Sequence, residues 1–373
     1  MKNLVLKPLN LIYNVLIAFV VMAVLFGITP QVVVLSIAVG ALSGIALGFV
    51  KNTPLALMAI QVEIWENHIE QEIFKDNTFL RKSYNADDYV INSKAVHIPQ
   101  SGGSGNVVKN RAVVPATVRK RNDTDVIYLL DEFTTDPVLI PDADTKELSY
   151  DKRNSVLDED RDKIVEVVAE ETIYNWLNSP AYGTYGVTAL PAANKLLTSG
   201  NAVVGTAPGA TGNRKAATLN DLQKMQTYFR SINRWFNDKM YCMLTPEMLA
   251  QIFPADSQIT ATYMQNVTES ERREGIMFKA QGWKIMSRST VTRTLVDGSI
   301  IAPGAIGNVD DDAASLFWYE KGVEFAFGGV EAFQDLGNPL YYGDVYSFLA
   351  RSGSRARRED YKGVAILRED KAV

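Results

Sequence analysis

The chain has 373 residues, of which 47% are hydrophobic and 22% are charged, the proportions of a globular protein with one large or two ordinary domains. Its net charge of −5 provides no overall positive field that would attract nucleic acid. Cys242 is the only cysteine, which excludes a disulfide within the chain and makes a thiolate metal cluster implausible. We expect it to be a buried structural thiol.

Two apolar runs open the chain. They cover residues 11–28 and 32–50, and each is about long enough to cross a bilayer. The second run carries three glycines at intervals of four residues: Gly40, Gly44 and Gly48. Such a face lets another helix approach closely, as in membrane helix pairs. Residues 1–57 are therefore predicted to form a hydrophobic helical hairpin that can contact a membrane, with Met58 as an alternative protein start.

A long polar excursion follows. The apolar residues of 64–74 have helical spacing and predict a short amphipathic helix that ends near Asn77. Residues 89–99 alternate like a strand, reach a tip rich in glycine and serine, and return over 107–130. A hairpin far from any core is marginal alone, so we expect a second copy of the chain to complete it.

The strongest helix signal lies at 160–177, where the apolar residues make one stripe opposite a charged face: Val165, Ala169, Ile173, Trp176 and Leu177. Asn178-Ser179-Pro180 is expected to end this helix. Farther on, Thr218 to Asp221 resembles a capping box. Thr245-Pro246-Glu247 supplies a cap, an N1 proline and a first-turn acid for another helix.

Strand signals are interleaved with these helices, without a regular βαβ rhythm. They lie at 239–244, 282–286, 315–319, 323–327, 346–351 and 364–367. We therefore predict an α+β fold.

No arrangement of residues indicates catalysis. The two histidines, His68 and His97, are predicted to lie on different elements and make poor candidates for a shared metal site or a triad. The glycine cluster at 102–105 lacks the Lys-Ser/Thr that follows in a phosphate-binding loop. Asp310–Asp312 is interpreted as an acidic turn, with a hard-cation site as the alternative. We predict no enzymatic activity and no cofactor.

The order of the parts carries a resemblance, supported by similar wording in several stretches. They are Val62-Glu63-Ile64-Trp65, Val96-His97-Ile98-Pro99-Gln100, Lys109-Asn110-Arg111, 148–155, and Asn338-Pro339 with Tyr342-Gly343-Asp344. Over about 58–370 this series resembles the HK97-type major capsid proteins of tailed phages. The second and third stretches are most similar to capsid sequences from phages of Bacteroidetes hosts.

The resemblance implies an HK97-like capsid fold with the following parts: an N-terminal arm at 58–88, an extended loop at 89–131, a peripheral domain at 132–218 with a spine helix at about 156–177, an axial domain at 219–305, and return strands of both domains at 306–373. The hydrophobic hairpin at 1–57 departs from the family's pattern. The implied function is a major capsid protein that assembles in the host cytoplasm. Its pentamers and hexamers would form an icosahedral virion shell around double-stranded DNA. Portal proteins and scaffold or decoration proteins are the other implied partners.

The extended loop is then expected to lie across a neighbouring subunit, through His97, Gln100, Gly102, Gly103, Lys109, Arg111, Arg119 and Arg121. The spine helix is expected to pack through Val165, Ile173 and Trp176. Two basic stretches either are solvated, pair with acidic patches of neighbouring subunits such as 159–162, or contact packaged DNA. These stretches are Arg111 with 119–121, and Arg351, Arg355, Arg357 and Arg358.

Two alternatives remain open. One is a bilayer-anchored protein whose soluble part faces the cytoplasm, which would depend on residues 1–57. The other is an encapsulin-like shell that shares the fold but encloses a cargo enzyme.

Overall fold

The computed structural model describes residues 77–91, 95–100, 107–112, 114–115, 118, 120–121, 124–141, 152–179, 188–255 and 257–372. The chain divides into the units Met1–Asn67 and His68–Val373, and every described residue belongs to the second. The predicted hydrophobic hairpin and nearly all of the predicted amphipathic helix lie outside the described residues. Within the described ranges, no helix is long and apolar enough to cross a membrane.

The described part of the chain has the predicted α+β character. Its largest sheet has seven strands in the order β13-β14-β12-β16-β19-β9, with β15 paired to β16. The strands are β9 (Lys195–Leu197), β12 (Met240–Leu244), β13 (Phe278–Ala280), β14 (Trp283–Ser287), β15 (Thr292–Thr294), β16 (Asp312–Tyr319) and β19 (Val364–Arg368). Strand β12 lies at the centre and all five of its residues are buried, as expected for a continuous apolar run. Cys242 is therefore buried, as predicted, and burial raises the pKa of its thiol.

Four helices belong to the same region: α6 (Leu219–Ser231), α7 (Pro246–Ile252), α8 (Gln258–Gln265) and α9 (Glu269–Arg273). The capping signals read in the sequence are confirmed for two of them. The backbone N–H of Thr218 donates to the Asp221 carboxylate at 3.0 Å, which closes the capping box of α6. The side chain of Thr245 accepts from the backbone N–H of Met248 at the start of α7.

A second sheet is built around a long ribbon of β17 (Val323–Asn338) and β18 (Gly343–Ala356), which pair antiparallel over most of their length. Strands β1 (Tyr84–Asn85), β5 (Asp131–Thr134) and β6 (Val138–Pro141) pair with its edges. The predicted strands at 323–327 and 346–351 were too short. Half-exposed and exposed residues alternate beyond Gly328, so pairing along the ribbon, rather than burial, extends these strands.

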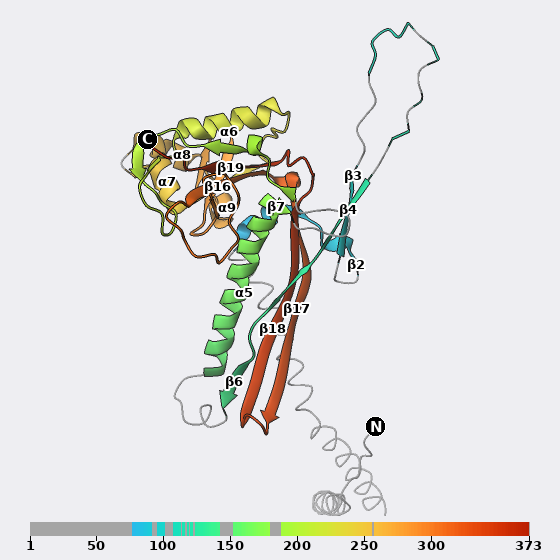
Figure 1. Cartoon of the computed structure of the whole chain (residues 1–373), viewed down its shortest axis with the longest axis vertical. Helices are drawn as coiled ribbons and strands as arrows, with labels where there is room; N and C mark the ends of the chain where they lie inside the picture. The colour runs from blue at the N-terminus through green and yellow to red at the C-terminus, as the bar shows by residue number, and fades with distance from the viewer. Residues whose placement is uncertain are drawn as a thin grey trace, which may run out of the picture. The chain divides into compact units, whose positions relative to one another are not determined.

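The spine helix α5 (Lys152–Leu177) runs alongside this ribbon (Figure 1). It begins earlier than the predicted start at about 156 and ends at the predicted residue. The next two residues form β7 (Asn178–Ser179), which pairs with β8 (Thr188–Ala189). The other short elements are η1 (Thr78–Lys82), η2 (Asp87–Tyr89), η3 (Ala192–Asn194), η4 (Glu320–Gly322), β10 (Ala202–Val204) and β11 (Asn213–Lys215).

Two tryptophans join these parts. Trp176 of α5 and Trp318 of β16 are both fully buried, with ring centroids 5.8 Å apart. The indole N–H of Trp176 donates to the carbonyl of Glu324 at 2.9 Å, and that of Trp318 donates to the carbonyl of Lys82 at 2.9 Å. The ring of Phe79 lies edge-on against Trp176 at 5.8 Å. The spine helix, both sheets and the chain just after Asn77 are therefore held at one point.

Candidate assembly surfaces

The base of the extended loop is a three-stranded sheet of β2 (Val90–Ile91), β3 (Ala95–Gln100) and β4 (Thr124–Leu129). Its apolar side chains form a buried cluster with the ribbon and with η2's preceding residue: Ala86, Val96, Ile98, Tyr128, Leu130 and Ala326. This differs from the expectation that a second copy completes the whole hairpin, because the chain's own ribbon completes the base.

Two glycines of the ribbon make room for that base. A Cβ on Gly353 would lie 2.6 Å from Leu130 Cδ2 and 3.0 Å from Tyr128 Cε2. A Cβ on Gly328 would lie 2.8 Å from Leu130 Cδ1. Since carbon atoms pack at about 3.5–4.0 Å, any side chain at these positions would push the loop base off the ribbon.

The second basic stretch points into the chain itself, which makes the expectation of free intersubunit or DNA-binding arginines wrong for this stretch. Arg355 is fully buried, and Arg357 Nε lies 3.0 Å from the buried carboxylate of Glu324. Arg351 pairs with Glu132 and Glu331 across the ribbon sheet, and Arg358 pairs with Asp360. The guanidinium of Arg357 also lies 3.9 Å from the centre of the Tyr84 ring. Burial raises the pKa of Glu324, although its hydrogen bonds with Tyr128 and Arg357 oppose that shift.

The distal half of the extended loop has the opposite character, because its apolar side chains face solvent. Val107 is 97% exposed and Val118 is 94% exposed, and Val108 and Val114 are exposed as well. Contiguous exposed apolar residues on a soluble chain mark contact sites. These valines were missed in the sequence, where the only available signal was an apolar pair at 107–108 and another at 113–114, without a predicted partner strand.

The predicted loop contacts fall into three groups. His97 is half-buried on β3, and Gln100 ends that strand. Basic side chains on the distal half are exposed: Lys109, Arg111 and Arg121. Gly102, Gly103, Arg119 and the membrane-type glycines at 40, 44 and 48 lie outside the described residues. On the spine helix, Val165, Ile173 and Trp176 are all buried within the chain.

The ribbon tip is a second exposed apolar surface. Leu340 is 80% exposed and Tyr342 is 81% exposed, with Tyr341 between them also exposed. Polar side chains fix the turn: Asn338 Oδ1 accepts from the backbone N–H of Leu340 at 2.8 Å. Asp344 Oδ1 likewise accepts from the N–H of Gly337 at 2.9 Å. The tip therefore presents its apolar side chains on a fixed backbone.

A third apolar surface lies on the loops between β15 and β16. Ile306 is 94% exposed, and Leu295, Val296 and Val309 are exposed beside it in sequence. The acidic cluster that follows, Asp310–Asp312, is only partly a surface turn. Asp312 is buried and pairs with Arg214 at 2.6 Å and with Arg368 at 3.2 Å, and buried Asp311 pairs with Arg293 at 2.8 Å. These carboxylates fix the β10–β11 hairpin and the β15 edge to β16, so the cation-site alternative is not supported.

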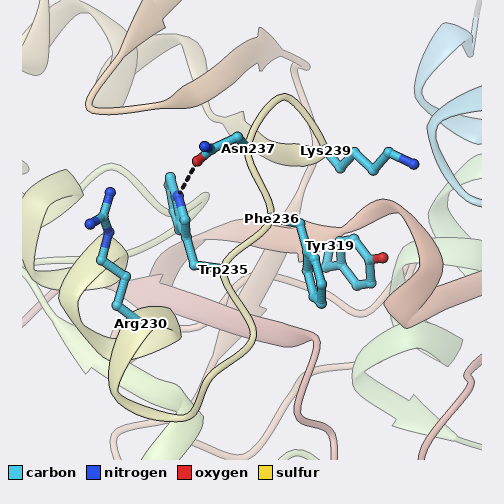
Figure 2. A pocket seen from close by; sticks show the side chains of 6 residues that line it. All are labelled: Arg230, Trp235, Phe236, Asn237, Lys239 and Tyr319. Atoms are coloured by element: carbon cyan, nitrogen blue, oxygen red, sulfur yellow. Dashed lines mark hydrogen bonds between the residues drawn. The ribbon is translucent and has the colours of Figure 1, made fainter.

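A cavity of about 580 Å³ lies at the loop between α6 and β12. It is lined by Arg230, Trp235, Phe236, Asn237, Lys239 and Tyr319 (Figure 2). Phe236 stacks on Tyr319 at 4.3 Å, and the Trp235 indole donates to Asn237 Oδ1 at 3.1 Å. No carboxylate or imidazole is among these lining residues, so the cavity lacks an acid–base pair. Within the described ranges, no group of three or more His, Cys, Asp or Glu could hold a metal ion.

Sequence comparison and structure comparison give different results. No protein-family model matches the chain, and no curated protein matches it in sequence. Solved phage structures do match in fold. A chain of the Cyanophage Pam1 capsid is 11% identical with a TM-score of 0.55, covering 78% of this chain and 91% of that one. A chain of the Ralstonia phage GP4 capsid is 12% identical with a TM-score of 0.53, covering 78% and 88%. The capsid of Cyanophage P-SCSP1u gives 17% identity and a TM-score of 0.51, with 78% and 86% covered.

These likenesses define the class of fold. The chain shares the HK97-like fold of phage capsid proteins, as predicted from the order of its parts. Because the identities are low, the likeness concerns the path of the chain rather than its residues.

Proposed function

We propose that this chain is a major capsid protein that assembles into pentamers and hexamers of an icosahedral shell enclosing phage double-stranded DNA. The observation that carries this proposal is the fold shared with three phage capsid chains over 78% of the sequence. Shell formation is a structural activity, so no residue is assigned a catalytic role.

The exposed apolar surfaces support self-assembly. They lie on three separate parts of the chain: the distal half of the extended loop, the ribbon tip, and the loops between β15 and β16. Three separate surfaces let one subunit contact several neighbours at once. Many modest contacts add up across a closed symmetric shell, so each can be weak while the particle is stable.

We assign the parts to shell positions as the resemblance implies. The extended loop lies across a neighbouring subunit, the axial region (219–305) meets its copies at the capsomer centre, and the arm (58–88) clasps another subunit. Portal and scaffold or decoration proteins are the other partners, and packaged DNA contacts the inner face without sequence preference. The host remains a prediction from the likeness of 96–100 and 109–111 to Bacteroidetes phage capsids.

Electron microscopy of the purified full-length chain tests the proposal. Negative-stain images should show closed shells or capsomers, and analytical ultracentrifugation should show species far larger than one chain. A strictly monomeric protein at high concentration would contradict the proposal.

The role of residues 1–57 is tested separately. We propose that this segment either docks assembling shells on the membrane or packs inside them as an apolar scaffold. A version that starts at Met58 should be soluble and assemble. Partition of that version with membranes would favour the membrane-anchored alternative, and a co-purifying cargo enzyme would favour an encapsulin-like shell. Mass spectrometry of finished particles shows whether residues 1–57 are retained.

A further inference from the structure

A groove of about 550 Å³ runs between the β5–β6 edge of the ribbon sheet and the spine helix α5. Its apolar lining consists of Phe133, Val138, Ile164 and Val167. Three carboxylates, Glu132, Asp136 and Asp160, lie among these side chains. Lys163 is the one cation among the lining residues, and Glu166 pairs with it at 2.7 Å. The groove is therefore apolar with an excess of negative charge.

Asp160 is the least satisfied group in this groove. Its Oδ2 atom is buried and has no hydrogen-bond partner among the described residues. Burial raises the pKa of this carboxyl, and the carboxylates of Glu159 and Asp136 raise it further. The nearest base in sequence, Arg161, pairs with Asp158 and Asp162 instead. A buried acceptor without a partner is unfavourable, so the site would gain from a cationic group placed in the groove.

The segments that form the groove are acidic well beyond its lining. Residues 131–141 contain three acids and no base, and residues 158–171 contain seven acids and two bases. Together they give ten acids against two bases. Within the described ranges these acids form no cluster suited to a metal ion, so a positively charged polypeptide fits this surface better than a bound cation.

The distal half of the extended loop has the complementary composition. Residues 107–121 contain five bases and no acid. The same stretch carries the exposed valines, and Lys109, Arg111 and Lys120 are exposed between or beside them. It therefore offers alternating apolar and cationic groups, which match the apolar lining and the carboxylates of the groove.

We propose that the groove between β5–β6 and α5 binds the basic stretch 107–121 of the extended loop from a second copy of this chain. This proposal rests on the proposed shell function and names the surface that receives the loop. The valines pack on Phe133, Val138 and Val167, while lysine and arginine side chains reach Asp136 and Asp160. Charge pairs at such a contact select the correct partner and register, and apolar burial supplies most of the affinity.

Reciprocal charge exchange in the full-length chain tests this contact. The loop variant combines Lys109→Glu with Arg111→Gln, and the groove variant combines Asp136→Lys with Asp160→Asn. Each change should lower the yield of shells by about tenfold or more, because like charges then face each other. Combining the loop and groove variants should restore most of the yield, since the pairs are re-formed with opposite polarity.

Matched controls carry the same kind of charge change elsewhere. Lys321→Glu and Glu359→Lys alter exposed residues outside the groove and the loop, so they should assemble like the wild type. Circular dichroism and thermal unfolding of the dissociated subunits should give unchanged curves for every variant. A loss of shells that the combined variant does not rescue would overturn the proposed contact.

The outcomes separate this inference from the proposed function. Wild-type shells together with normal shells from the loop variant would overturn the contact and leave the capsid function intact. Failure of the wild type to form any assembly would overturn both. The loop might instead serve DNA: normal shell yield with weakened binding of a fluorescent duplex DNA in the loop variant would show that, and would also overturn the contact.

Discussion

The seven-stranded sheet and the distal half of the extended loop bury their apolar residues in opposite ways. In the sheet, β12 and its neighbours bury Cys242, Trp283 and Phe317 completely within one chain. In the loop, Val107 and Val118 are almost fully exposed. Similar apolar side chains are therefore satisfied by the chain in one region and left for a partner in the other. A single subunit is complete as a folded body but incomplete as an assembled one.

The base of the loop marks the boundary between the two regimes. Tyr128 and Leu130 pack on the ribbon of the same chain, whereas the described residues from 107 to 121 are exposed. Substitutions on the two sides of this boundary should therefore separate folding from assembly.

The largest expected effect is on folding. Trp176→Ala should lower the free energy of unfolding by about 3–5 kcal/mol, because it empties a fully buried site and removes the hydrogen bond to Glu324. Urea unfolding of dissociated subunits measures the change. Leu340→Ala at the exposed ribbon tip is the control and should stay within about 0.5 kcal/mol. Equal effects from the two substitutions would refute the division between core and surface.

The buried ion pair gives a matched test two residues apart in the sequence. Asp312→Asn should cost about 3–5 kcal/mol, because Arg214 would remain buried without its anion. Asp310→Asn breaks an exposed pair with Lys371 and should cost about 0–1 kcal/mol. Thermal unfolding of both variants checks the difference. Similar melting temperatures for the two would mean that the Asp312 network contributes little to the fold.

A smaller effect is expected at the boundary itself. Gly353→Ala should cost about 1–3 kcal/mol through overpacking against Leu130 and should loosen the loop base. Limited proteolysis should then cut the extended loop faster than in the wild type. In a Leu130→Ala background the same substitution should cost less, because the clashing methyl is gone. Additive effects of the two changes would exclude this contact as the cause.

The smallest effect on folding should accompany a large effect on assembly. Val107→Ser with Val118→Ser should change unfolding by about 0.5 kcal/mol or less, since both side chains are already in water. The yield of shells, measured by sedimentation, should fall clearly. Met264→Ser on α8 removes a partly exposed apolar side chain elsewhere and should leave the yield unchanged. Normal assembly of the valine variant would place the loop contact on other residues.

Local signals in the sequence predicted the parts that depend on neighbours along the chain. The caps at Thr218 and Thr245 set the starts of α6 and α7, and the apolar run at 240–244 became the central strand β12. The end of the spine helix at Leu177 was also predicted correctly. In each case the determining interactions lie within a few residues, so the pattern alone was sufficient.

Long-range pairing was not visible in the same way. Beyond Gly328 the ribbon carries glycine and polar residues, and only its partner β18 makes it a strand. The arginines at 351–358 looked like a free basic stretch, but their acidic partners come from positions as distant as Glu132 and Glu324.

The sequence by itself determined the α+β class, the capped helices, the buried thiol and the order of parts that indicated a capsid fold. Only the tertiary structure decided which charges are neutralised within the chain, which loop residues the ribbon covers, and which apolar side chains remain exposed. The physical reason is that helix caps and buried runs depend on local geometry, whereas ion pairing and burial depend on segments that meet only after the chain has folded.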